Sequence, residues 1–195
     1  MFKENEKGYQ IVCYLEGESF IKVRNIQQKL FELTGSNKCL NSWEPHVTIG
    51  SGIIVSSDKQ QEMEESFQEL VNKQEKFTIT IENFDGISNW AGAKEGVLTP
   101  YVLWIDVKMN ERLMNLFKDT ASLITDKYDT WWSRIIDYVP HITVAYGDLT
   151  EEGYKIGMDY LKSINFYEEI VISHIALVEY SENKDIEYKR FFFKK

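Results

Sequence analysis

Two of the chain's three histidines follow a proline in matching five-residue strings. The first is Pro45-His46-Val47-Thr48-Ile49, and the second is Pro140-His141-Ile142-Thr143-Val144. Alternation of polar and β-branched residues predicts a β-strand for each string. Residues i and i+2 of a strand point the same way, so each histidine shares a face with its threonine. Two imidazole–hydroxyl pairs on two sheet faces are suited to holding a phosphate and moving protons around it.

Hydrolysis of a phosphodiester needs a base for the nucleophile and an acid for the leaving oxygen. Histidine, with an unperturbed pKa of about 6.5, suits both roles, so His46 and His141 are the predicted pair. Thr48 and Thr143 would donate hydrogen bonds to the non-bridging oxygens. The residues leave open which histidine is the acid. No cofactor is expected, and two histidines alone leave a zinc site short of ligands.

Tryptophan and tyrosine side chains near the two strings are candidates for holding a nucleobase by stacking. Trp43 precedes His46 closely, and Trp131 and Trp132 lie before His141. Tyr14 and Trp104 occupy comparable positions in the first strand of each half. The alternative for each of these aromatic residues is packing at a sheet edge or in the core.

Other polar residues have simpler structural explanations. Lys94 and Arg134 could reach a phosphate, but each is more simply a solvated surface charge. His174 lies in an apolar strand and is predicted to be a satisfied structural histidine. Strict alternation puts Tyr146 on the face opposite His141, which favours packing there.

Hydrophobic spacing predicts the elements that must position the two strings. Gly35 is expected to end the first helix, and Ser56 or Ser57 to cap the second. The glycines at 153 and 157 weaken the last helix. The expected strands cover about 9–16, 45–50, 76–84, 101–109, 140–146, 167–180 and 185–194, and the expected helices about 18–34, 57–73, 110–127 and 150–164.

Each half therefore has the order β-α-β-α-β with one string in its second strand, which indicates an internal duplication. We expect an α+β fold comprising one two-lobed, pseudo-symmetric domain over residues 1–195. Antiparallel sheets line a central cleft, with the helices outside. The lobes would cover about 1–90 and 100–195, with room for the sheets to exchange terminal strands. The stretch 85–100 would be a linker or lid.

Composition narrows the class of partner and the compartment. The 195 residues are 43% hydrophobic and carry a net charge of −9, so binding of long duplex nucleic acid is not expected. The charged N-terminus does not read as a signal peptide, and no apolar run has the length of a membrane helix. Two isolated cysteines, Cys13 and Cys39, indicate free thiols and a cytoplasmic protein. We expect a monomer.

The paired His-x-Thr strings, with the element order and the closing pattern 175–181, resemble the two-histidine (2H) phosphoesterase superfamily. That superfamily includes 2′-5′ RNA ligase-like proteins and cyclic nucleotide phosphodiesterases. The resemblance implies that both histidines contact one phosphate of a small nucleotide or RNA end. A basic residue often follows the second motif in the family, where this chain has Tyr146. A silent nucleotide-binding module on the same fold, RNA end joining, and cleavage of a cyclic or 2′-5′-linked oligonucleotide signal are the alternatives.

Overall fold

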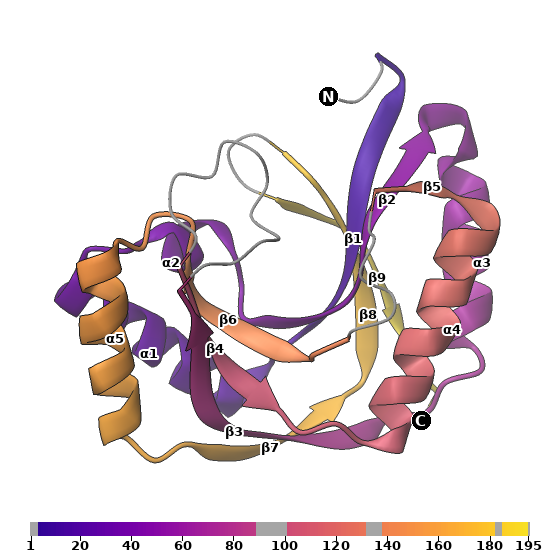
Figure 1. Cartoon of the computed structure of the whole chain (residues 1–195). Helices are drawn as coiled ribbons and strands as arrows, with labels where there is room; N and C mark the ends of the chain where they lie inside the picture. The colour runs from indigo at the N-terminus through magenta and orange to yellow at the C-terminus, as the bar shows by residue number, and fades with distance from the viewer. Residues whose placement is uncertain (1–3, 89–100, 132–137, 182–184, 195) are drawn as a thin grey trace.

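The computed structural model describes residues 4–88, 101–131, 138–181 and 185–194. Two antiparallel sheets face each other in it, as Figure 1 shows. The five-stranded sheet has the order β5 (Asp129–Thr130), β2 (His46–Ser56), β1 (Glu6–Tyr14), β8 (His174–Glu179) and β9 (Ile186–Phe192). The four-stranded sheet has the order β6 (His141–Tyr146), β4 (Val102–Val107), β3 (Phe77–Ile87) and β7 (Tyr167–Ile172). The predicted α+β class is confirmed.

The helices lie on the outer faces of the two sheets (Figure 1). Helices α1 (Gly17–Thr34), α2 (Lys38–Ser42) and α5 (Glu151–Ser163) cover the four-stranded sheet. A 3-10 turn (Ser57–Lys59) leads into α3 (Gln60–Val71), which with α4 (Glu111–Lys127) covers the five-stranded sheet. None of the helices described is long and apolar enough to cross a membrane.

The core fills the space between the sheets and their helices. It contains the apolar positions of both motif strands, all of which are buried: Val47, Ile49, Ile142 and Val144. Helices α3 and α4 contact β2, and α1 and α2 contact β6, so helices lie outside both motif strands as expected. Because neighbouring residues of a strand point to opposite sides, this burial turns the histidines and threonines away from the helices.

Each sheet takes strands from both halves of the chain. Strands β1 and β2 pair with β5 and β8, whereas β3 joins the later strands β4, β6 and β7. The single strand expected over 167–180 is wrong: β7 ends at Ile172 in one sheet, and β8 begins at His174 in the other. The division into duplicated halves stays a prediction.

The ends and contacts of the helices explain several details of the sequence. Gly35 has a φ of 77° and donates its N–H to Phe31 O, so the predicted C-cap is confirmed. Ser56, one of the two predicted caps, is the N-cap residue of the 3-10 turn that leads into α3, but its side chain makes no capping hydrogen bond. In α5, a Cβ at Gly157 would lie 2.7 Å from Leu103 Cδ1, so glycine permits the close approach of this helix to β4. The short elements α2 and β5 were not predicted.

Helix α4 packs behind the first motif strand and is held at its N-terminus by Asn110. The Asn110 side chain accepts the Leu113 N–H at 2.8 Å and donates to Thr78 O at 2.9 Å. Asn110→Ala should lower the free energy of unfolding by about 1–2 kcal/mol, because it removes the cap. Urea denaturation measures this, with Ser122→Ala on the exposed face of α4 as the control. Equal stability of Asn110→Ala and the unsubstituted protein would contradict the assigned cap.

Candidate functional site

The two motif strands begin at their histidines and carry the same set of backbone contacts. Pro45 O accepts the N–H of Leu15 at 2.9 Å, and Pro140 O accepts the N–H of Val107 at 3.2 Å. A proline disfavours the helical conformation for the residue before it, so each string enters its strand extended. The two histidines thus start from equivalent backbone positions in the two sheets.

The neighbouring strands put different side chains opposite the two histidines. Tyr14 of β1 is paired with His46, and Asp106 of β4 is paired with His141. Directly opposed residues of antiparallel strands share a face. Each histidine therefore has one side chain beside it on the cleft face, a phenol for His46 and a carboxylate for His141.

One hydrogen bond fixes the orientation of each imidazole. His46 Nδ1 lies 2.6 Å from Glu44 O, and His141 Nδ1 lies 2.8 Å from Val139 O. A carbonyl oxygen can only accept, so Nδ1 carries the hydrogen in both rings. In the neutral ring, Nε2 then presents its lone pair. Among the described residues, neither Nε2 has a hydrogen-bond partner.

Both imidazoles have pKa values below the usual 6.5 of histidine. Burial lowers the pKa of His46 to about 4, opposed by its bond to Glu44 O and helped by the charge of His141. Burial also lowers the pKa of His141, opposed by its bond to Val139 O and by the negative charge of Asp106. The strands that carry the two histidines, β2 and β6, also contact each other, which fits two imidazoles at one site.

The threonines occupy the same cleft faces, two residues after the histidines. Thr48 and Thr143 are half-buried, and neither hydroxyl has a hydrogen-bond partner within the described part of the chain. Both hydroxyls are therefore available to donate to a bound anion.

Hydrogen bonds to their backbone carbonyls tie the two motif strands to the rest of the molecule. The Tyr138 hydroxyl donates to Thr48 O at 2.9 Å, and its ring stacks on Phe117. From α1, the buried side chain of Gln27 donates to Thr143 O at 3.4 Å. Tyr138 stands two residues before Pro140, so its bond joins the approach of the second motif directly to the first motif strand.

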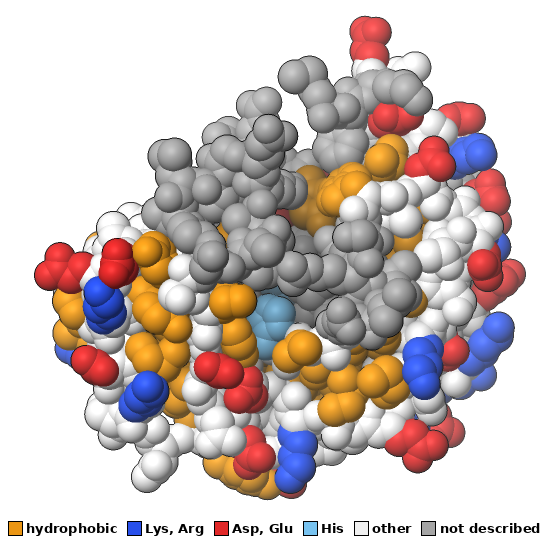
Figure 2. Space-filling model, viewed as in Figure 1, with side chains coloured by type: hydrophobic (Ala, Val, Ile, Leu, Met, Phe, Trp, Pro, Cys, Tyr) orange, Lys and Arg blue, Asp and Glu red, His pale blue; other side chains and the backbone are white. Residues whose placement is uncertain are grey.

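A pocket of about 300 Å³ opens beside His46, on the cleft face of β1 and β8. Its described lining includes Val12, Tyr14, Trp43 and Glu44. In Figure 2 a histidine surface lies in a hollow of this face of the molecule, bordered by hydrophobic side chains. The site therefore joins titratable groups to a recess that both apolar and acidic side chains line.

Three of the five predicted aromatic residues lie at the site. The Tyr14 ring packs edge-on against His46 with centroids 6.1 Å apart, and the Trp104 ring lies 5.6 Å from that of His141. Trp43 lines the pocket. Trp131 lies by the other end of β2, where it donates its backbone N–H to Gly52 O and contacts Tyr180. Whether any of these four residues binds substrate stays a prediction.

The expected placement of Tyr146 is wrong. Trp104 pairs with Thr143 and Val102 pairs with Tyr146, so β6 has one extra residue between these two pairs. This bulge returns Tyr146 to the face that carries His141. There its ring stacks on Trp43, with centroids 5.3 Å apart and planes 13° apart.

His174 is buried as predicted, but only half satisfied. It is 2% exposed, and its Nδ1 lies 3.2 Å from Ser173 Oγ. Its Nε2 is buried and has no partner among the described atoms. The ring lies beside Tyr14 on the cleft face of the five-stranded sheet. The other predicted polar candidates, Lys94 and Arg134, and the aromatic Trp132, lie outside the described residues.

Asp106 is a functional candidate that the sequence analysis missed. Its carboxylate accepts the Trp104 indole N–H at 2.8 Å and lies across the strand pair from His141. The signal was an acidic residue inside the apolar string Val102-Leu103-Trp104-Ile105-Asp106-Val107. In the parts of the chain that the structure describes, no group of three or more His, Cys, Asp or Glu side chains could hold a metal ion.

One family model matches most of the chain. The model of the 2′-5′ RNA ligase superfamily matches residues 40–184, a span that contains both motifs. A search of curated proteins finds no match.

Solved structures share the fold at low sequence identity. Escherichia coli LigT complexed with 3′-AMP is 15% identical with a TM-score of 0.65, over 97% of this chain and 99% of that one. The protein TT0787 of Thermus thermophilus is 12% identical with a TM-score of 0.66, over 95% and 97% of the two chains. E. coli LigT complexed with phosphate is 12% identical with a TM-score of 0.60, over 98% of this chain and all of the other.

The hydrogen bonds of the two imidazoles predict their tautomer and titration. In nitrogen-15 NMR spectra, His46 and His141 should both carry hydrogen on Nδ1 when neutral. The His46 ring should take up its second proton only near pH 4, and the His141 ring below pH 6.5, because burial disfavours the charged forms. His46→Ala and His141→Ala spectra assign the signals. Neutral rings with hydrogen on Nε2 would contradict the assigned bonds.

Proposed function

Because the chain belongs to the 2′-5′ RNA ligase superfamily, we propose that it is a phosphoric diester hydrolase acting on a nucleotide or RNA end. The expected substrate carries a 2′,3′-cyclic phosphate or a 2′-5′ linkage. Membership in the superfamily supports a phosphoesterase-type activity. The observation that carries the finer proposal is the pair of imidazoles, each with Nδ1 bound to a carbonyl and Nε2 without a described partner.

The proposed reaction is proton transfer by the two Nε2 atoms around one phosphate. One neutral imidazole takes a proton from water as the water oxygen bonds to phosphorus. The ester bond to one ribose oxygen breaks, and the second imidazole, initially protonated, gives that oxygen its proton. The product of a cyclic substrate is a nucleoside monophosphate. Thr48 and Thr143 donate to the non-bridging oxygens as their charge grows.

The neighbours of the two histidines favour one assignment of roles. Asp106 faces His141 and favours its protonated form, whereas Tyr14, a neutral phenol, faces His46. The charge of His141 further disfavours a proton on His46. We therefore assign His46 as the base and His141 as the acid for this reaction, with Asp106 as a positioning residue.

Two observations extend the proposal, one from solved structures and one from this chain. The complexes of E. coli LigT with 3′-AMP and with phosphate fit a site for a small nucleotide, and we propose such a ligand here. The side chains of Cys13 and Cys39 are buried free thiols, which fits the proposed cytoplasmic location.

Replacing either histidine should remove most of the activity. His46→Ala and His141→Ala should each lower the rate by about 10²–10⁴-fold, because each removes one proton-transfer group. Phosphorus NMR follows the conversion of the four nucleoside 2′,3′-cyclic phosphates to monophosphates in excess chelator. Thermal unfolding of each variant shows whether the protein remains folded.

Three outcomes of these experiments would contradict the proposal or a part of it. An unchanged rate in one variant would overturn the two-histidine mechanism. Loss of activity in chelator, with recovery on adding one metal, would contradict the expectation that the reaction needs no metal. Binding without turnover by the unsubstituted protein would favour the alternative, a nucleotide- or RNA-end-binding module.

The role assignment predicts how the activity depends on pH. The base His46 must be neutral, so kcat/KM should fall as pH drops toward about 4. The acid His141 must be protonated, so kcat/KM should also fall as pH rises through its pKa, which lies below the usual 6.5. The profile should therefore be bell-shaped with its maximum on the acidic side of pH 6.5.

Asp106→Asn tests the positioning residue. Asparagine keeps an acceptor for the Trp104 indole but removes the charge that favours a proton on His141, so the alkaline limb should move to lower pH. Asp126→Asn, the same change at an exposed position of α4, is the control. An alkaline limb that Asp106→Asn leaves in place would contradict His141 as the acid.

A further inference from the structure

The pocket beside His46 has the shape and surface of a site for a flat aromatic group. Its volume of about 300 Å³ is at the lower end of small-molecule sites. Val12 and Val178, both buried, form an apolar floor between the polar side chains of the rim. Because His46 of the proposed phosphate site lines the pocket, a base bound in it can belong to the same nucleotide as the phosphate.

Trp43 forms an aromatic wall of the pocket and is held in place. Its ring stacks on that of Tyr146, and its backbone N–H donates to Cys39 O at 3.3 Å. Arg24 in turn donates to Cys39 O and Leu40 O, which secures the short helix before Trp43. A wall fixed in advance costs little ordering entropy when a ring stacks on it.

The carboxylates at the rim differ in whether they are already engaged. Asp185 accepts from Gln10 Nε2 at 3.0 Å, and Glu187 accepts from two nitrogens of Arg190. The Glu44 side chain has neither a hydrogen bond nor an ion pair with any described residue. Burial raises the pKa of Tyr14, and the negative charges of Glu187 and Glu44 raise it further, so Glu44 lies close enough to act on the pocket.

The charges of the lining disfavour a second phosphate in the pocket. Of the described residues that line the pocket, three are acidic and none is Lys or Arg. The two oxygens of the Glu44 carboxylate only accept hydrogen bonds. An aromatic ring with two donors on one edge would therefore suit it. Among the RNA bases, guanine has such an edge, with N1–H beside the N2 amino group.

We propose that this pocket binds the base of the substrate and that Glu44 selects guanine. Guanine stacks on Trp43 and donates N1–H and N2–H to the two Glu44 oxygens. Adenine and cytosine present a donor beside an acceptor, and uracil presents one donor between two acceptors, so each leaves the carboxylate poorly paired. The proposal rests on the proposed function, because it places the base next to the histidines.

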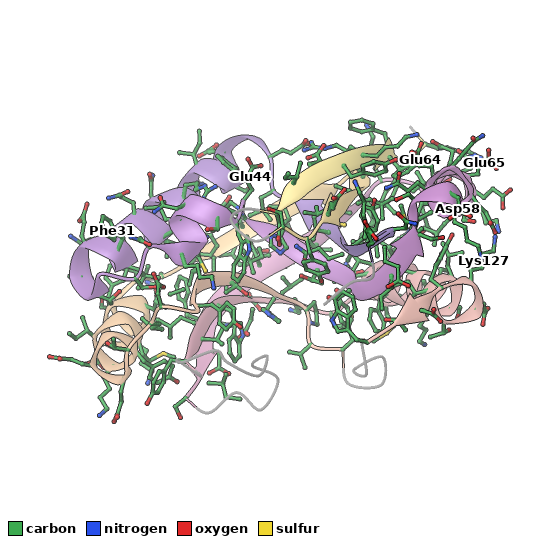
Figure 3. The ribbon with its side chains drawn as sticks, turned by 90° about the horizontal axis from the view of Figure 1, so that it is seen from above. Phe31, Glu44, Asp58, Glu64, Glu65 and Lys127 are labelled. Atoms are coloured by element: carbon green, nitrogen blue, oxygen red, sulfur yellow. The ribbon has the colours of Figure 1, made fainter. Side chains whose placement is uncertain are left out.

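Glu65 supplies a matched control for the substitution of Glu44. Figure 3 shows Glu44 near the middle of the molecule, whereas Glu65 lies at the far end on α3. Both side chains are exposed, so Glu44→Gln and Glu65→Gln make the same chemical change at and away from the pocket.

The test compares kcat/KM for the 2′,3′-cyclic phosphates of guanosine, inosine, adenosine, cytidine and uridine. Guanosine should be preferred by roughly 10- to 100-fold, the range for a bidentate pair, and inosine, without the 2-amino group, should be intermediate. Glu44→Gln should lower the value for guanosine to that for adenosine, and Glu65→Gln should change none. Trp43→Leu should lower kcat/KM for all five substrates.

Binding separates failure of this proposal from failure of the hydrolytic function. The dissociation constants of guanosine and adenosine 3′-monophosphate are measured with the unsubstituted protein and with Glu44→Gln. A guanine preference lost in Glu44→Gln, without turnover, would support the pocket and contradict the hydrolysis. Turnover with equal values for all bases, or a guanine preference that survives Glu44→Gln, would overturn the guanine site and leave the hydrolysis standing.

Discussion

The candidate site depends on a hydrogen bond from each motif imidazole to the carbonyl two residues before it. In both strings the accepting carbonyl belongs to the residue before the proline, and a proline disfavours the helical conformation for that residue. The hydrogen bond fixes both the orientation of the ring and its tautomer, so Nε2 faces the cleft without a second hydrogen bond. The buried apolar residues of each strand set the same orientation from the other side, because the core accepts only one register.

The chemical difference between the two histidines comes from their neighbours and not from the motifs. Two nearly identical strings begin at equivalent backbone positions, yet one faces a phenol and the other a carboxylate. A carboxylate stabilises a nearby imidazolium, while burial and the second imidazole disfavour another proton close by. A duplicated pattern thus gives a site with two distinct ends, which a symmetrical pair of strings could not do alone.

The sequence predicted the features that follow from local alternation of polar and apolar residues. It missed the features that depend on which strands pair. Both His-x-Thr faces, the main helices and the Gly35 cap follow from local patterns. The face of Tyr146 does not, because a bulge interrupts the alternation of β6. Nor do the break at Ser173 and the place of Asp106, which depend on which strands become neighbours. That choice is made by long-range packing of both halves, which no local window of sequence contains.

The mixed origin of the strands constrains how the chain can fold during synthesis. Strand β1 is central to its sheet, yet its neighbour β8 begins only at His174. A ribosome must therefore produce the chain beyond His174 before the first sheet is complete, and until then one edge of β1 is unpaired. Such an edge can pair with another nascent chain. Contacts between residues so distant in sequence also slow folding, which extends the time for which that edge is exposed.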